Sequence, residues 1–286
     1  MRDDGQLRAR TAGGLRSPAG RRRATLAQRA DKHALYERAV QDPAGDVMRL
    51  RRMFARVYGR PPRTLREDFC GTAALAAAWV AHSESRAVGI DLDPVPLAWG
   101  RRNHVARLRP DQAARLELLR GDVRTTRTRR VDVTAAFNFS YFLFKTRAEL
   151  LAYFRHVRAG LLEQGLFVLD AYGGPESMER REERRRCGGF TYVWDQDRFD
   201  PITHDTTCHI HFEFRDGSRL WRAFSYDWRL WTVPELRDLL AEAGFAGCSV
   251  YWEGTERGTL EPNGVFRERE HAEEDPAWIT YLVARR

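Results

Sequence analysis

The sequence predicts an α/β fold in which helices cover both faces of a parallel sheet. Two observations support this prediction: strand-like and helical segments alternate between residues 63 and 174, and an acidic residue stands at the end of each of the first three strands. With 286 residues, 43% of them hydrophobic, the chain can bury a substantial core. It contains no run of about 18 apolar residues, so we predict no transmembrane helix.

The N-terminal part of the chain is predicted to be a tail followed by a helical cap. Residues 1–28 mix Arg, Gly, Ala, Ser and Pro without apolar periodicity, and we expect them to be disordered. Residues 29–62 carry apolar side chains at helical spacing, which predicts two helices separated at Pro43–Gly45. Pro61 and Pro62 end the cap.

Residues 63–174 are the predicted core of the fold. Strands are expected at Thr64–Phe69, Arg86–Asp91, Leu116–Leu119, Val131–Phe137 and Gly165–Asp170. Helices are expected at Ala73–Ala81, Pro94–Leu108 and Arg147–Leu162. In sheets of this kind, ligands bind at the carboxyl ends of the strands.

Residues 175–231 interrupt the alternation and predict an antiparallel insertion, a lid, after the fifth strand. A charged helix is expected at Glu176–Arg186, followed by strands at Phe190–Trp194, Thr206–Phe214 and Arg219–Trp228. Asp216-Gly217 is a hairpin turn signal. Residues 232–286 return to the core, with a helix at Val233–Ala243, strands at Cys248–Glu253 and Trp278–Ala284, and a loop over residues 254–276.

The candidate ligand-binding residues lie at the ends of the predicted strands. Glu67–Ala73 is a tight turn before a helix, where backbone N–H groups face a polar ligand. Asp91 ends the second strand and is placed to accept hydrogen bonds from both hydroxyls of a ribose. Asp122 follows the third strand, where it could meet an adenine amino group. The three acidic strand ends together predict a nucleoside-binding site, although each aspartate alone could be a helix cap or a turn residue.

The segments Glu67–Ala73, Gly89–Asp93 and Gly121–Val123 resemble the cofactor motifs of class I S-adenosylmethionine (SAM) dependent methyltransferases. Trp231–Phe245 and the final strand are also similar to that family. The resemblance implies a Rossmann-like sheet of seven strands with the last one antiparallel, a SAM cofactor and methyl transfer.

The resemblance also assigns residues. It implies that Glu67 or Asp68 faces the methionine amino group of SAM, with the turn residues approaching the methionine backbone, the end of the second strand at the ribose, and the end of the third strand at the adenine. The implied cofactor residues are Glu67, Asp68, Cys70, Gly71, Thr72, Asp91, Leu92, Asp122, Val123 and Asn138.

Two positions depart from the family pattern, because Phe69 and Ala73 stand where glycine is usual. These departures leave open which acidic residue acts. They count more strongly against a nicotinamide-binding fold, since G-x-G-x-x-G does not fit Gly71–Ala76.

Asn138 and Ser140, after the fourth strand, are the polar candidates near the transferred methyl group, and Tyr226 of the lid is a candidate to take a proton. The segment Phe137–Phe142 is partly similar to the N-P-P-Y motif of enzymes that methylate planar amines, but both prolines are missing. Eleven aromatic residues between positions 190 and 231 could line a dry substrate pocket or could simply pack the strands.

Composition limits the remaining possibilities. Residues 1–30 hold eight arginines against two aspartates, so the tail carries most of the net charge of +8. We therefore expect a small-molecule substrate, methylated at nitrogen or oxygen by in-line displacement, rather than a nucleic acid. His209 and His211 share a strand face but lack a third ligand, so no metal is predicted. The four cysteines show no C-x-x-C spacing, which indicates a reducing environment and predicts a cytoplasmic location. The oligomeric state is not predicted.

Two other functions stay open at this point. One is a methyltransferase acting on RNA, DNA or protein that is recruited through the arginine-rich tail. The other is a non-catalytic module that binds SAM or a partner through the aromatic lid.

Overall fold

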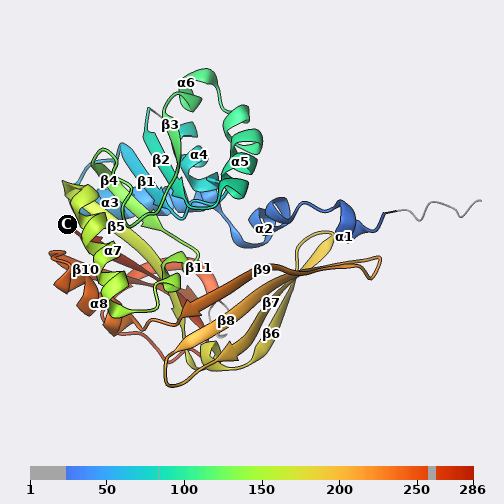
Figure 1. Cartoon of the computed structure of the whole chain (residues 1–286). Helices are drawn as coiled ribbons and strands as arrows, with labels where there is room; N and C mark the ends of the chain where they lie inside the picture. Colours follow the sequence, from blue (N-terminus) through green and yellow to red (C-terminus); the bar gives the residue numbers. More distant parts are fainter. Residues whose placement is uncertain (1–23, 83, 257–261) are drawn as a thin grey trace, which may run out of the picture.

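Two β-sheets dominate the molecule, as Figure 1 shows. A computed structural model describes residues 24–82, 84–256 and 262–286. The larger sheet has the strand order β11-β10-β12-β5-β4-β1-β2-β3. Its strands are β1 Thr64–Asp68, β2 Arg86–Asp91, β3 Leu116–Arg120, β4 Val131–Ala136, β5 Leu161–Gly173, β10 Gly247–Thr255, β11 Pro262–Arg269 and β12 Trp278–Arg285.

The first five strands are parallel, and β12 pairs antiparallel with β5, so the predicted α/β sheet with an antiparallel last strand is confirmed. The eighth strand, β11, lies at the edge in the segment predicted to be a loop. That prediction was wrong because an edge strand with mostly exposed, charged side chains lacks the apolar alternation of a buried strand. Residues 257–261 of the predicted loop lie outside the described residues.

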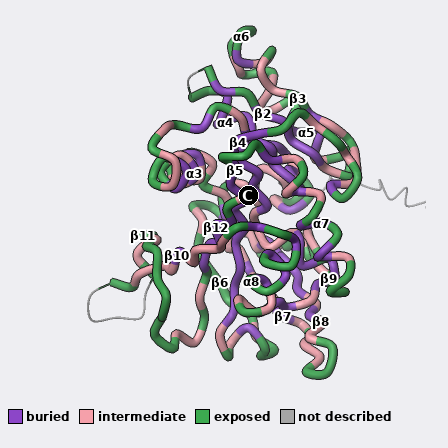
Figure 2. Tube along the Cα trace, turned by 90° about the vertical axis from the view of Figure 1, so that its left-hand side faces the viewer, coloured by how far each residue is buried: buried purple, intermediate pink, exposed green. Residues whose placement is uncertain are grey.

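Helices cover both faces of the larger sheet. Leu150 and Phe154 of α7 pack on one face with Leu240 of α8, and Phe54 of α3 packs on the other face with Val80 of α4. Figure 2 shows the buried strands between the more exposed helices. The helices are α1 Leu26–Arg29, α2 Lys32–Val40, α3 Pro43–Tyr58, α4 Ala74–Ala81, α5 Pro94–Asn103, α6 Pro110–Ala113, α7 Arg147–Gly160 and α8 Val233–Glu242, with short 3₁₀ turns at Val105–Arg107, Ser140–Leu143 and Pro175–Met178.

Local capping sets the boundaries of the N-terminal helices. Asp42 accepts a hydrogen bond from the backbone of Gly45 and Pro43 follows it directly, so the predicted interruption at Pro43–Gly45 is the first turn of α3. Helix α1 begins inside the segment predicted to be disordered, because Thr25 and Gln28 form a capping box there. The order of residues 24–28 corrects the tail boundary, whereas residues 1–23 lie outside the described residues.

The lid is a four-stranded antiparallel sheet of β6 Arg181–Arg186, β7 Phe190–Phe199, β8 Asp205–Phe214 and β9 Arg219–Arg229. The charged helix predicted at Glu176–Arg186 is wrong, since this segment forms a 3₁₀ turn and the edge strand β6. Its charged side chains find partners across the sheet, for example Arg184 with Glu213 of β8. Such cross-strand pairs stabilise a strand but give no apolar period to read.

Helix α2 belongs to the lid as much as to the core. Leu35 and Ala39 pack with Phe190, Ile210 and Phe212 of the lid in one apolar cluster. Its opposite side reaches the turn after β1, as described below. Within the described ranges, no helix is long and apolar enough to cross a membrane.

Candidate active site

The turn between β1 and α4 has a glycine-like backbone at three positions. Phe69, Gly71 and Ala73 have φ angles of 55°, 53° and 58°. Positive φ values are disfavoured for side chains with a Cβ. The two positions that depart from the family's glycines therefore keep the backbone conformation that glycine would adopt without strain, and the turn is retained despite the substitutions.

The neighbouring acidic residues Glu67 and Asp68 have different environments. Asp68 Oδ1 accepts a hydrogen bond from Arg66 Nε at 2.7 Å, and Oδ2 accepts one from the Tyr153 hydroxyl of α7 at 2.9 Å. Glu67 Oε2 accepts the backbone N–H of Ala76 at 2.8 Å. Since Ala73 has no capping side chain, Glu67 caps one of the N–H groups in the first turn of α4. Both carboxylate oxygens of Asp68 are thus bound within the core, whereas, among the described residues, one oxygen of Glu67 is not.

Burial changes the protonation of Glu67. The carboxyl group lies among other acidic groups in a nearly dry environment, and this burial raises its pKa to about 8. The second oxygen, Oε1, has no hydrogen-bond partner among the described residues. It can accept from a cationic group, which would also stabilise the ionised carboxylate.

Asp91 connects the ends of β1 and β2. Its Oδ2 accepts the N–H of Gly71 at 2.7 Å, and its Oδ1 accepts the N–H of Asp93 at 2.8 Å. A carboxylate oxygen has two lone pairs, so each oxygen can still accept one further hydrogen bond. The next residue, Leu92, is 67% exposed and offers an apolar surface. Glu67, Gly71 and Asp91 together are called the cofactor cradle below.

The segment after β3 is less open. Asp122 is bound by Arg124, with Arg124 Nη2 at 2.7 Å from Asp122 Oδ2, and these hydrogen bonds lower the pKa of Asp122. The side chain of Val123 is buried, and its carbonyl accepts from Arg66 at 2.9 Å. An adenine could reach the Asp122 carboxylate only if Arg124 moved.

Side chains of the turn contact the protein interior. Cys70 is 2% exposed, its Sγ would lie 3.0 Å from a Cβ at position 89, and burial raises its pKa well above the usual value. Thr72 donates its hydroxyl to Glu37 of α2 at 2.5 Å, and Glu37 also lies 2.6 Å from His104 Nε2. These two turn residues shape the cradle, and the backbone N–H and carbonyl of Cys70 are also used within the protein, by Ile90 and Ala73.

The loop after β4 is held by a carboxylate that the sequence analysis missed. Asn138 and Phe139 both have positive φ, and they donate their N–H groups to Asp170 Oδ2 and Oδ1 at 2.7 and 2.9 Å. Ser140 donates its hydroxyl to the carbonyl of Phe137 at 2.8 Å. Burial raises the pKa of Asp170 to about 7. The available signal was its place at the end of the fifth predicted strand, which makes it a fourth acidic strand end.

Tyr226 reaches this loop through aromatic contacts. Its ring stacks on Trp228 with centroids 4.3 Å apart, and Trp228 lies 6.4 Å from Phe139 in an edge-to-face arrangement. The side chain of Tyr36 of α2, a residue that sequence reasoning also missed, lies near its hydroxyl. The three catalytic candidates thus lie at one end of the sheet, with Asn138 and Ser140 on the loop and Tyr226 on the lid above it.

The structure shows packing for several of the lid aromatics. Phe190 and Phe212 are buried in the cluster with α2, which is ordinary strand packing. Tyr226 and Trp194 pack, like Phe139, against the large core cluster. Packing is therefore observed for these residues, and the lining of a substrate pocket stays a prediction.

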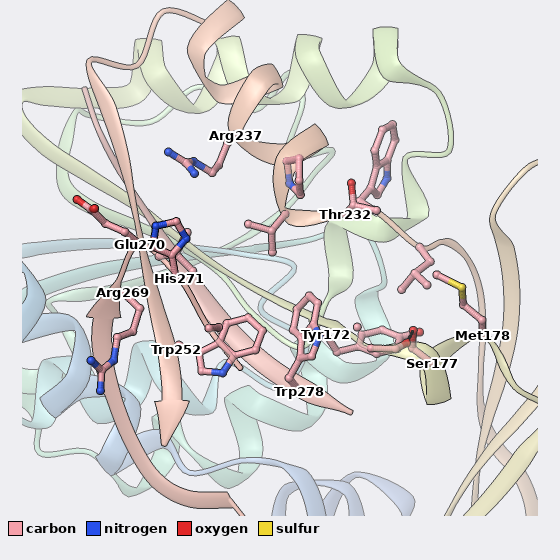
Figure 3. A pocket seen from close by; sticks show the side chains of 18 residues that line it. Tyr172, Ser177, Met178, Thr232, Arg237, Trp252, Arg269, Glu270, His271 and Trp278 are labelled. Carbon is pink, nitrogen blue, oxygen red and sulfur yellow. Dashed lines mark hydrogen bonds between the residues drawn. The ribbon is translucent and has the colours of Figure 1, made fainter. Parts of the chain in front are cut away.

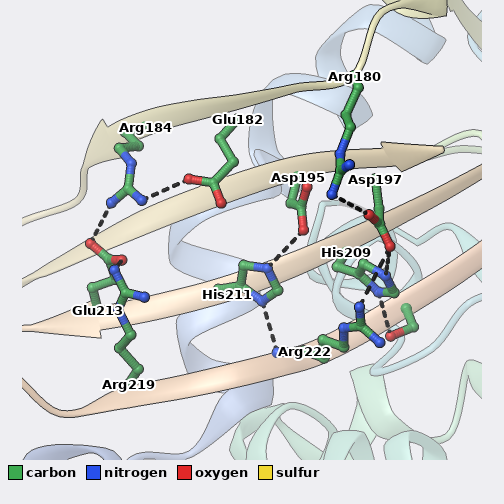
Figure 4. A network of polar contacts seen from close by, with 11 residues as sticks. Arg180, Glu182, Arg184, Asp195, Asp197, His209, His211, Glu213, Arg219 and Arg222 are labelled. Carbon is green, nitrogen blue, oxygen red and sulfur yellow. Dashed lines mark hydrogen bonds and ion pairs between the residues drawn. The ribbon is translucent and has the colours of Figure 1, made fainter.

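The lid histidines have protein partners. His209 Nδ1 lies 2.8 Å from Ser225 Oγ. His211 Nδ1 accepts the N–H of Arg222 at 2.7 Å, and its Nε2 lies 3.1 Å from Asp195 (Figure 4). Across the described residues, no cluster of three or more His, Cys, Asp and Glu side chains is suited to a metal ion.

Comparison with known proteins supports the fold. Neither a protein-family model nor a curated protein matches the sequence. Among solved structures, a SAM-dependent methyltransferase from Clostridium acetobutylicum matches with a TM-score of 0.62 and 17% identity, over 88% of this chain and 96% of that chain. This chain has the class I SAM-dependent methyltransferase fold.

Two further matches share this methyltransferase fold. The SAM-bound amino pentose methyltransferase CalS10 from Micromonospora echinaspora has a TM-score of 0.60 and 18% identity, over 89% of this chain and 96% of that chain. The sugar N-methyltransferase KedS8 from Streptoalloteichus has a TM-score of 0.61 and 18% identity, over 99% of both chains.

Proposed function

We propose that this protein is an enzyme that binds SAM and transfers its methyl group to the nitrogen of a small-molecule amine. The cofactor cradle is the observation that carries the proposal, because its acidic groups keep free acceptor positions. Each oxygen of Asp91 has a lone pair left for one hydroxyl of a ribose, and Glu67 Oε1 is free for an ammonium group. These are the polar groups that SAM presents beside its sulfonium.

When bound, SAM supplies a methyl group already activated by the positive sulfur, so the protein has mainly to bind, orient and exclude water. The loop held by Asp170 would present Asn138, whose side-chain amide has no hydrogen-bond partner among the described residues. That amide can accept a hydrogen bond from an amine and fix the direction of its lone pair. Ser140 would act on the loop itself, since its hydroxyl closes the turn.

Tyr226 would orient the acceptor and would not remove a proton from it. Burial raises the pKa of its phenol well above the usual value, so the group stays protonated at neutral pH. The oxygen of a protonated phenol keeps its lone pairs, so it can still accept a hydrogen bond from an amine. The acceptor amine must enter neutral, and after methyl transfer the product ammonium can release one proton to solvent.

The choice of an amine over a hydroxyl is supported by the neighbours, which include a sugar N-methyltransferase and a glycopeptide N-methyltransferase. It is also supported by the absence of a strong base among the loop residues, because a hydroxyl must lose a proton to react whereas an amine need not. The expectation of a cytoplasmic enzyme stays a prediction, with which the four free cysteines agree.

Calorimetry with SAM tests the cradle. Wild-type protein should bind SAM in the micromolar range, and Asp91→Ala should weaken binding at least about tenfold, since two hydrogen bonds to the ribose are lost. Asp111→Ala removes an exposed carboxylate elsewhere and is the matched control. Undetectable binding to wild type would refute the proposal.

Labelled methyl transfer tests the acceptor class. With methyl-labelled SAM, extract fractions of small molecules, RNA and protein should differ, and label should appear in small amines only. Removing residues 1–23, which precede Thr25 and the first helix, should leave this pattern unchanged. Label in RNA or protein that depends on the tail would favour the alternative acceptor class, and SAM binding without any product would favour a non-catalytic module.

A further inference from the structure

A cavity of about 340 Å³ lies beside α8, as Figure 3 shows. Its walls come from the end of β5 and the segment after it, from the start of α8, and from β10, β11 and β12. None of its lining residues belongs to the cofactor cradle or to β1, β2 or β3. Small-molecule pockets commonly measure about 300–1,000 Å³, so the cavity is large enough for a ligand of its own.

Aromatic side chains form the middle of this cavity. The rings of Trp252 and Trp278 have centroids 4.8 Å apart. Trp278 lies directly over Gly173 of β5, where a Cβ would come within 2.3 Å of the indole ring. Only glycine at position 173 permits this arrangement, so the aromatic wall depends on the local backbone. Flat indole faces of this kind pack well against aromatic or aliphatic groups.

Two arginines stand at one end. Arg237 of α8 and Arg269 at the end of β11 have no side-chain hydrogen bond or ion pair with any described residue. Figure 3 shows them with Glu270 and His271 at one end of the cavity. One carboxylate against two guanidinium groups leaves a positive excess. Unpaired guanidinium groups bind carboxylate, sulfonate or phosphate through parallel N–H donors.

We propose that this cavity is a second binding site, for a small aromatic or apolar molecule that carries one anionic group. The apolar part lies against the paired rings of Trp252 and Trp278, and the anionic group faces the end of the cavity that carries Arg237 and Arg269. The inference does not rest on the proposed methyl transfer, because the cavity shares no residue with the cradle.

Titration with anilinonaphthalene sulfonate, a fluorescent aromatic anion, tests the site in the full chain. The double variant Arg237→Ala/Arg269→Ala should bind the probe at least tenfold more weakly. Its matched control is Arg102→Ala/Arg107→Ala, which removes the same charge from two exposed arginines of another surface. Trp252→Ala should also weaken binding, whereas Trp221→Ala, at an exposed lid tryptophan, should not.

The outcomes separate clearly. Equal losses in both arginine double variants, or no loss in either, would overturn the site. A neutral analogue, N-phenylnaphthylamine, should bind more weakly than the sulfonate, and equal affinity would overturn the role of the anion. Saturating SAM should leave probe binding in place, and displacement of the probe by SAM would overturn the separation from the cradle. A chain that failed to bind SAM would still give the expected probe result.

Discussion

The strand ends of the core and the outer face of the lid hold their polar side chains in different ways. In the core, Glu67, Asp91 and Asp170 accept backbone N–H groups of the adjacent turns. On the lid, side chains pair with one another, as His211 does with Asp195 and Arg184 with Glu213 (Figure 4). A carboxylate that holds a turn must stand at one fixed position, so it can be recognised as a sequence motif. The two members of a cross-strand pair can be exchanged for each other, so such pairs produce no motif.

Removing one ion pair from each region should give the largest difference in the free energy of unfolding. Arg66 and Asp68 are both almost completely buried, with side chains 1% and 0% exposed. Arg66→Ala leaves an unpaired buried carboxylate and should lower the free energy of unfolding by about 3–5 kcal/mol. On the lid, Arg184→Ala breaks pairs that are partly exposed and should cost at most about 1 kcal/mol. Urea unfolding measures both, and similar losses would remove the distinction between the regions.

Asp170→Asn should have a smaller effect on stability and a specific effect on turnover. An amide can accept only one of the two N–H groups of Asn138 and Phe139, so one buried donor loses its partner, at about 1–3 kcal/mol. We expect methyl transfer to fall while SAM affinity stays within about twofold, because the change leaves the acceptor oxygens of Glu67 and Asp91 in the cradle intact. Calorimetry and product formation separate the two, and an equal loss of SAM affinity would contradict this division.

The raised pKa of Glu67 predicts a pH-dependent affinity for SAM. Below its pKa of about 8 the carboxyl is mostly protonated, and binding an ammonium group requires release of that proton. Affinity should therefore rise as pH increases toward 8, by at most about tenfold per pH unit, and level off above it. Glu67→Gln should flatten the profile. Calorimetry in buffers of different ionisation enthalpy counts the released proton, and an unchanged proton release in Glu67→Gln would assign it to another group.

The smallest effect concerns backbone strain in the turn. Ala73→Gly should raise the free energy of unfolding by about 0.5–1 kcal/mol, because glycine adopts a φ of 58° without steric cost. Ala77→Gly, in the interior of α4, the helix that follows the turn, should lower the free energy of unfolding by at least about 0.5–1 kcal/mol. Thermal and urea unfolding of the two variants provide the measurement. Destabilisation by both would mean that the turn is not strained.

Elements are most predictable from the sequence where burial and backbone requirements coincide. Strand β2 was predicted with its observed bounds, because an apolar run ends at an acidic residue there. The edge strands β6 and β11 were missed, since charged side chains with one neighbouring strand carry no apolar period. The roles of Asp170 and Glu37 depend on partners about 30 residues or more away in the chain, and local patterns cannot show such contacts.

Helix α2 has a consequence for engineering this protein. Its Leu35 and Ala39 pack into the lid, and its Glu37 holds Thr72 in the turn beside the cradle. Grafting residues 175–231 from a related enzyme to change the acceptor would leave a helix shaped for the original lid. The exchangeable module is therefore discontinuous in the chain. A working chimera should carry α1 and α2 together with the lid, and the position of Glu37 should keep the residue that pairs with the turn of the recipient enzyme.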